Sequence, residues 1–122
     1  MRRLVGIALS LACLSTPVWA ASLPLRPGGY VEIGTRCSDG SDANSLDYLH
    51  GVIETGGMTT RGQHVVSQRG NTFVLAAKVR DNQAGTSELD IETVTIHSPM
   101  AFRLKTKYGS ADYRWCHEDS AL

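Results

Sequence analysis

Hydrophobic and polar residues alternate along two segments of this chain, and a period of two is typical of half-buried β-strands. In residues 72–80, one face carries Phe73, Leu75, Ala77 and Val79. In residues 101–108, one face carries Phe102, Leu104, Thr106 and Tyr108. The pattern predicts a mainly β fold, an antiparallel meander that forms a small sandwich or partial barrel.

A third strand is predicted over residues 88–96, but its apolar residues change phase. They are Leu89, Ile91, Val94 and Ile96. The first two share one face of a regular strand, and the last two fall on the opposite face. A β-bulge at Glu92 and Thr93 would bring all four to the same face. We therefore expect a bulge there.

Two dipeptides with glycine first, Gly70-Asn71 and Gly109-Ser110, each fit a two-residue hairpin loop. Pairing outward from them predicts the partners Arg69 with Thr72, Gln68 with Phe73, Val66 with Leu75, Thr106 with Tyr113 and Leu104 with Trp115. Val66 with Leu75 and Leu104 with Trp115 join apolar residues, as neighbouring strands around one core require.

The segment 88–96 is acidic, and basic residues occur on both predicted neighbours. The predicted partners are Arg80 with Glu88, Lys78 with Asp90, Val94 with Leu104, Ile96 with Phe102, Glu92 with Lys105 and Asp90 with Lys107. Opposite charges in register are ordinary cross-strand pairs on a solvated sheet face. We interpret them as structural.

The N-terminal half gives weaker signals. Prolines make residues 23–29 an extended lead-in, and residues 30–33 form a short predicted strand. Residues 46–54 are either one strand interrupted at Gly51 or a tight hairpin over His50-Gly51. The segment 39–42 is an alternative start for one short helix.

Residues 1–20 have the features of a secretory signal peptide. Arg2 and Arg3 precede an apolar run over residues 4–14, and Ala20 ends a suitable cleavage site. The run is too short to span a bilayer, so no transmembrane segment is predicted. We expect residues 21–122 to form a single β-rich domain exported to the periplasm or beyond. Lipidation of Cys13 is the alternative.

Export leaves Cys37 and Cys116 as the two cysteines of the mature chain. An even pair in an exported protein predicts a disulfide. This bond would link the start of the sheet to its last strand.

Charge and motifs exclude several functions. Without Arg2 and Arg3 the chain has ten basic and twelve acidic residues, so nucleic acid is not an expected partner. The common signatures of hydrolases, zinc proteases and phosphate-binding loops are absent from the sequence. We expect no catalytic residues and no cofactor. We expect a non-enzymatic binding protein with a protein or glycan partner, and a small secreted enzyme without a recognisable motif is the alternative.

Metal binding has little support. The four histidines are His50, His64, His97 and His117, and their spacing matches no familiar ligand set. Residues 39–47 are rich in oxygen ligands but lack the alternating spacing and the terminal glutamate of a calcium loop. No metal is predicted, and calcium binding by Asp39–Asp47 remains an open alternative.

Two resemblances extend this interpretation. Residues 23–31, 34–37 and 113–116 resemble the ends of small exported bacterial proteins of unassigned function. Residues 108–113 are similar to the Ser-Gly-x-x-Tyr loop of periplasmic inhibitors of chicken-type lysozyme, which are small disulfide-containing β-barrels. That likeness implies that Ser110 and Tyr113 contact a lysozyme partner.

The chain departs from the inhibitor pattern at two points. The serine and glycine stand in reversed order, and the Phe-Trp-x-Lys-Gly run expected after the loop is absent. The alternative is an ordinary Gly-Ser hairpin turn with Tyr113 in the core.

Overall fold

The computed structural model describes residues 23–120, which form eight antiparallel strands. They are β1 (Gly28–Glu32), β2 (Ser45–Leu49), β3 (Val52–Thr55), β4 (Met58–Arg69), β5 (Thr72–Asp81), β6 (Ser87–Ser98), β7 (Ala101–Thr106) and β8 (Gly109–His117). A three-residue 3₁₀ turn, Cys37–Asp39, is the one helical element of this part. The mainly β prediction is confirmed, whereas the predicted signal peptide lies outside the described residues.

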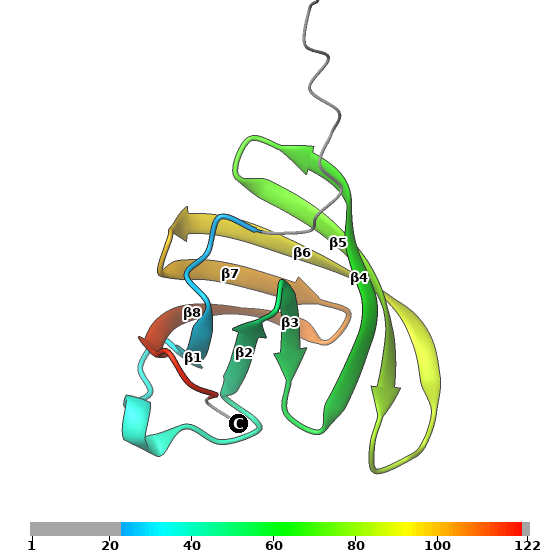
Figure 1. Cartoon of the computed structure of the whole chain (residues 1–122), viewed down its shortest axis with the longest axis horizontal. Helices are drawn as coiled ribbons and strands as arrows, with labels where there is room; N and C mark the ends of the chain where they lie inside the picture. Colours follow the sequence, from blue (N-terminus) through cyan, green and yellow to red (C-terminus); the bar gives the residue numbers. More distant parts are fainter. Residues whose placement is uncertain (1–22, 121–122) are drawn as a thin grey trace, which may run out of the picture.

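The strands form a nearly closed barrel. Their order in the sheet is β3-β2-β1-β8-β7-β6-β5-β4, so neighbours in sequence pair with each other except at β3 and β4, and β8 returns to β1 (Figure 1). The two ends of this order, β3 and β4, also contact each other. Of the two predicted architectures, the partial barrel is the one observed.

Two predicted hairpins are present. Leu49 pairs with Val52 across His50-Gly51, which decides between the two alternatives for residues 46–54. His50 and Gly51 have φ of 55° and 77°, as a turn matched to the twist of the strands requires. Arg69 pairs with Thr72 across Gly70-Asn71.

The β4–β5 register shifts at two places, between Arg61 and His64 and between Val65 and Ser67. Gln68 pairs with Phe73 as predicted, but Val65 rather than Val66 lies opposite Leu75. A register shift between Val65 and Ser67 displaces Val66, which is exposed. A bulge adds one residue to one strand, so simple counting from the turn fails beyond it.

The β7–β8 hairpin differs from the prediction. The loop is Lys107-Tyr108, with Thr106 paired to Gly109, so Gly109-Ser110 begins β8 instead of forming the turn. Gly109 still uses its freedom there, with φ of 136°. Tyr113 therefore lies opposite Phe102, not Thr106.

Trp115 is likewise not the partner of Leu104, which pairs with Ala111. The observed register of β7 with β8 differs from the predicted register by an even number of residues. Because side chains alternate with a period of two, the shift leaves the predicted inward faces unchanged.

The prediction for strand β6 differs most from the structure. Val94 pairs with Leu104 and Ile96 with Phe102, as predicted. The register shift lies between Ile96 and Ser98, however, and β6 pairs with β5 without interruption. The predicted bulge at Glu92 and Thr93 is wrong.

Because the bulge is absent, other side chains face outward than those predicted. The observed pairs are Arg80 with Ser87, Lys78 with Leu89, and Thr93 with Lys105, in place of the predicted partners Glu88, Asp90 and Glu92. Leu89 and Ile91 are 71% and 54% exposed on the outside of the barrel. The alternate residues, including Asp90 and Glu92, face its interior, because β6 keeps a regular pleat.

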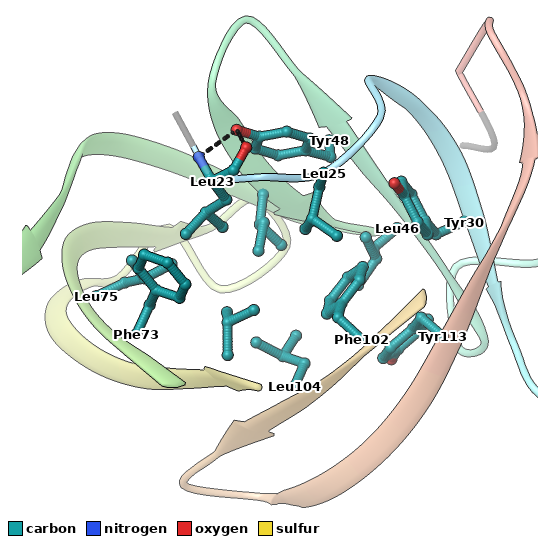
Figure 2. Packing of buried hydrophobic residues seen from close by; sticks show 12 residues of the cluster. Leu23, Leu25, Tyr30, Leu46, Tyr48, Phe73, Leu75, Phe102, Leu104 and Tyr113 are labelled. Atoms are coloured by element: carbon teal, nitrogen blue, oxygen red, sulfur yellow. Dashed lines mark hydrogen bonds between the residues drawn. The ribbon is translucent and has the colours of Figure 1, made fainter. Parts of the chain in front are cut away.

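One half of the barrel is filled with apolar side chains. The largest fully buried ones include Tyr30, Leu46, Leu75, Val94 and Phe102. The Phe102 ring packs edge-on against Tyr30 and stacks on Tyr113, with centroid distances of 5.1 and 5.6 Å. These residues form one continuous core (Figure 2).

The lead-in closes this end of the barrel. Leu23 and Leu25 are buried in the core, and Figure 2 shows both side chains directed into it. The Leu23 N–H donates to the Tyr48 hydroxyl at 2.8 Å. The Arg26 N–H donates to the Pro99 carbonyl in the β6–β7 turn at 2.7 Å. The predicted extended segment therefore closes one end of the barrel.

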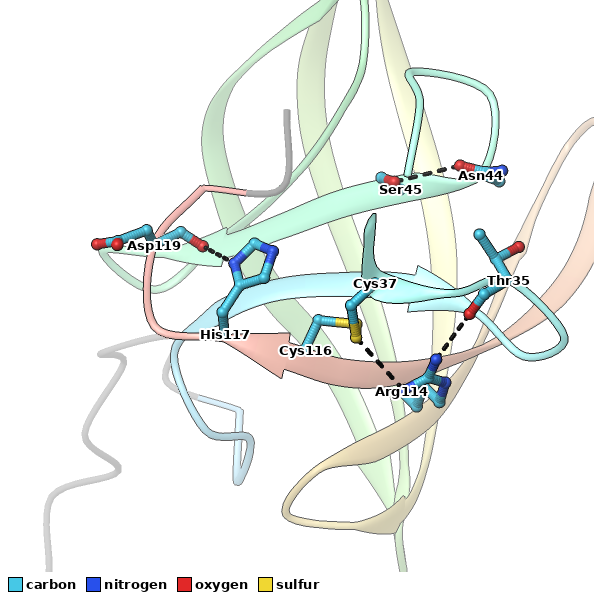
Figure 3. Close-up of a disulfide and its surroundings, with 8 residues drawn as sticks. All are labelled: Thr35, Cys37, Asn44, Ser45, Arg114, Cys116, His117 and Asp119. Carbon is cyan, nitrogen blue, oxygen red and sulfur yellow. Dashed lines mark hydrogen bonds between the residues drawn. A yellow bond between two sulfur atoms is a disulfide. The ribbon is translucent and has the colours of Figure 1, made fainter. Parts of the chain in front are cut away.

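The predicted disulfide is confirmed. Cys37 and Cys116 are bonded, with an S–S distance of 2.04 Å. Arg114 lies beside the bond and donates to the Thr35 carbonyl at 2.7 Å (Figure 3). The bond thus ties the long β1–β2 connection to β8. Within residues 23–120, no helix has the length and apolar character needed to cross a membrane.

Candidate functional site

The end of the barrel opposite the lead-in contains a cavity of about 430 Å³. The adjacent ends of the strands line it, because successive antiparallel strands bring alternate ends to the same rim. Ile53, Val79, Leu104 and Tyr113 form its apolar part. The cavity is therefore continuous with the core on one side and open on the other.

Five carboxyl side chains line this cavity. They are Glu32 from β1, Asp81 from β5, and Glu88, Asp90 and Glu92 from β6. The three on β6 are alternate residues, so a regular strand directs all of them to one face. The arrangement gives the open end of the barrel a negative potential.

Glu92 is the carboxyl with the largest electrostatic perturbation. Its burial, together with the charge of nearby Asp90, raises the pKa of Glu92 to about 7. The same cause raises the pKa of Tyr113, and the charges of Glu32 and Glu92 add to it. The Tyr113 hydroxyl thus lies within the field of two cavity carboxylates.

Lys107 in the β7–β8 loop supplies a cation at the rim. Its ammonium pairs closely with Glu88 and lies 3.4 Å from Asp90 Oδ1. The hydrogen bond to Glu88 raises the pKa of Lys107, so the ammonium remains charged. Lys107 and Asp90, predicted as strand partners, therefore meet as an ion pair beyond the end of β7.

The residues singled out by the lysozyme-inhibitor resemblance both line the cavity, in different environments. Ser110 is exposed near the β7–β8 loop. Tyr113 is only 9% exposed, and its ring stacks on Phe102. The hairpin brings the two residues to the same cavity, but Tyr113 belongs to the barrel core.

The candidate metal ligands do not come together. In the part of the chain that the structure describes, no three His, Cys, Asp or Glu side chains are arranged to hold a metal ion. His97 faces Asp112 at 3.4 Å, and the Nδ1 of His117 lies 3.0 Å from the Asp119 carbonyl. In the segment 39–47, the Asn44 side chain accepts the Ser41 N–H and closes a local turn.

Sequence reasoning missed the cavity because it assigned the acidic residues of β6 to the outside. The signal was present in the alternation of Glu88, Asp90 and Glu92. Cross-strand charge pairing accounted for the same spacing, so the alternation was not diagnostic. Comparison of the chain with family models, curated proteins and solved structures gave no match.

Proposed function

We propose that this chain is an exported, non-enzymatic binding protein that holds a small ligand, or one part of a larger partner, in the barrel cavity. The observation that carries the proposal is the asymmetry of the barrel. One end is sealed by Leu23 and Leu25, while the other has an open cavity of about 430 Å³. Ligand pockets in proteins are typically about 300–1,000 Å³.

The size of the barrel supports the same proposal. An eight-stranded barrel is wide enough either to be filled by its own side chains or to hold one small ligand. Here large side chains fill only the half around Phe102, whereas smaller residues such as Thr60, Thr106 and Ala111 line the open half. The open half combines an apolar floor with polar groups, as binding sites for small molecules do.

An NMR titration tests this proposal with three probes of similar shape, 2-phenylethanol, 2-phenylethylammonium and phenylacetate. We expect at least one of them to perturb the amides of Leu104, Thr106 and Tyr113 in a saturable manner. Ala111→Phe should abolish the perturbation by filling the cavity, whereas Ala84→Phe in the exposed β5–β6 loop should not. Thr106→Phe serves as the second blocking variant if Ala111→Phe does not fold.

Two results would overturn the proposal. One is that no probe binds the wild-type protein. The other is that folded blocking variants bind the probes as well as the wild type does, which would place the probes on the outside of the barrel.

A further inference from the structure

We propose that the cavity selects ligands in which a compact organic cation, such as a primary ammonium group, is attached to an apolar body. Glu92 and Asp90 would hold the cation, and the floor around Leu104 would hold the body. This inference rests on the proposed binding function and assigns the chemical class of its ligand.

The orientation of β6 provides the first argument. Its regular pleat exposes Leu89 and Ile91 and directs Asp90 and Glu92 inward. A bulge before Val94 would reverse this arrangement, and burial of large aliphatic side chains is favourable. The fold thus turns carboxylates into the barrel, although apolar residues of the same strand could have taken these positions. Such a departure from apolar-inside patterning is expected at functional sites.

The charge balance of the cavity provides the second argument. Lys107 neutralises part of the charge at the rim, where it pairs with Glu88 and Asp90. Glu92 lies deeper, and within residues 23–120 it belongs to no ion pair with a basic side chain. A bound cation would offset the cost that burial and Asp90 impose on the Glu92 carboxylate. The inner part of the cavity therefore favours a positive group.

The remaining lining distinguishes an organic cation from a metal ion. Ile53, Val79 and Leu104 present apolar surface beside the carboxylates, and the Tyr113 ring borders the same space. A hydrated metal ion would gain nothing from this surface, whereas the hydrocarbon part of an amine would be removed from water. The apolar lining of the cavity, and not the acidic residues alone, thus defines the ligand.

The three probes of the titration separate charge from shape. Near pH 8 and at low ionic strength, we expect 2-phenylethylammonium to bind about tenfold more tightly than 2-phenylethanol, and phenylacetate to bind more weakly than the alcohol. Glu92→Gln should weaken ammonium binding about fivefold or more and leave alcohol binding within about twofold. The matched control, Asp39→Asn, removes an exposed carboxyl outside the cavity and should change neither.

The outcomes distinguish this inference from the proposed function. Equal binding of the ammonium and the alcohol, abolished by Ala111→Phe, would overturn the cation preference and leave the cavity as a binding site. A preference that Glu92→Gln and Asp90→Asn both leave intact would also overturn it. Failure of every probe to bind would overturn both proposals.

Discussion

The side-chain amide of Gln63 forms two hydrogen bonds with the main chain of Ile53. Gln63 Oε1 accepts the Ile53 N–H at 2.8 Å, and Gln63 Nε2 lies 3.3 Å from the Ile53 carbonyl, to which it donates. The side chain thus takes the part that a strand backbone would play between β3 and β4. Glu54 reinforces this contact by accepting the Thr60 N–H at 3.3 Å. The barrel is closed here by side chains.

Gln63→Ala should therefore destabilise the barrel by about 1–3 kcal/mol, because it leaves two main-chain groups of Ile53 without their partners. We expect a lower midpoint of urea unfolding and faster hydrogen exchange at the Ile53 amide. The control is Gln83→Ala in the exposed β5–β6 loop, which should be nearly neutral. Unchanged exchange at Ile53 would show that Gln63 does not hold the seam.

The orientation of β6 is tested by a pair of leucines. Leu104→Ala removes a side chain that is 3% exposed and should cost about 2–5 kcal/mol. Leu89→Ala removes one that is 71% exposed and should cost less than about 0.5 kcal/mol. Chemical denaturation of both variants gives the comparison. Similar losses of unfolding free energy at the two positions would contradict this orientation and would indicate that Leu89 faces the interior, as a bulge requires.

The Cys37–Cys116 bond should contribute about 4 kcal/mol, because it closes a loop of 79 residues in the unfolded chain. We expect the double variant Cys37→Ser with Cys116→Ser to unfold at a clearly lower urea concentration. Wild-type protein treated with a reducing agent should behave in the same way, and the reducing agent should not affect the double variant. A double variant as stable as the oxidised wild type would contradict this prediction.

Tyr113→Ala should cost about 3–5 kcal/mol, because it removes a buried ring that stacks on Phe102. Tyr113→Phe keeps the ring and is the matched control. Since Tyr113 is a core residue, we also expect the wild-type protein to leave the activity of chicken-type lysozyme unchanged. Inhibition of lysozyme, lost in Tyr113→Phe without loss of stability, would instead support the contact role of Ser110 and Tyr113.

The pH dependence of stability should report on Glu92. Its pKa is raised from an ordinary value of 4.5 to about 7, so the folded protein binds more protons than the unfolded chain between these values. Stability should therefore fall as the pH rises through this window. Glu92→Gln should remove this pH dependence. As the pH rises from 5 to 8, the free energy of unfolding of the variant should increase by about 2 kcal/mol relative to that of the wild type, because solvent screens part of the interaction.

Urea unfolding at several pH values measures this difference directly. Asp39→Asn, which changes an exposed carboxyl outside the cavity, should run parallel to the wild type across the same range. A constant difference between Glu92→Gln and the wild type would show that the carboxyl is not perturbed by its surroundings.

The sequence alone determined the features that depend on near neighbours in the chain. Alternation assigned Phe73, Leu75 and Leu104 to the core, and Gly70-Asn71 marked a turn. The disulfide followed from the number of cysteines expected after export. The first two inferences need only a local pattern, and the disulfide needs only a count of cysteines.

The tertiary structure decided which face of β6 points inward. Both faces carry a plausible set, Leu89 and Ile91 on one and Asp90 and Glu92 on the other, and a single added residue exchanges them. The choice depends on how the neighbouring strands are registered and on how much space the barrel leaves at its open end. The closure of the barrel by Gln63 is of the same kind, because it brings together residues that only the completed barrel makes neighbours.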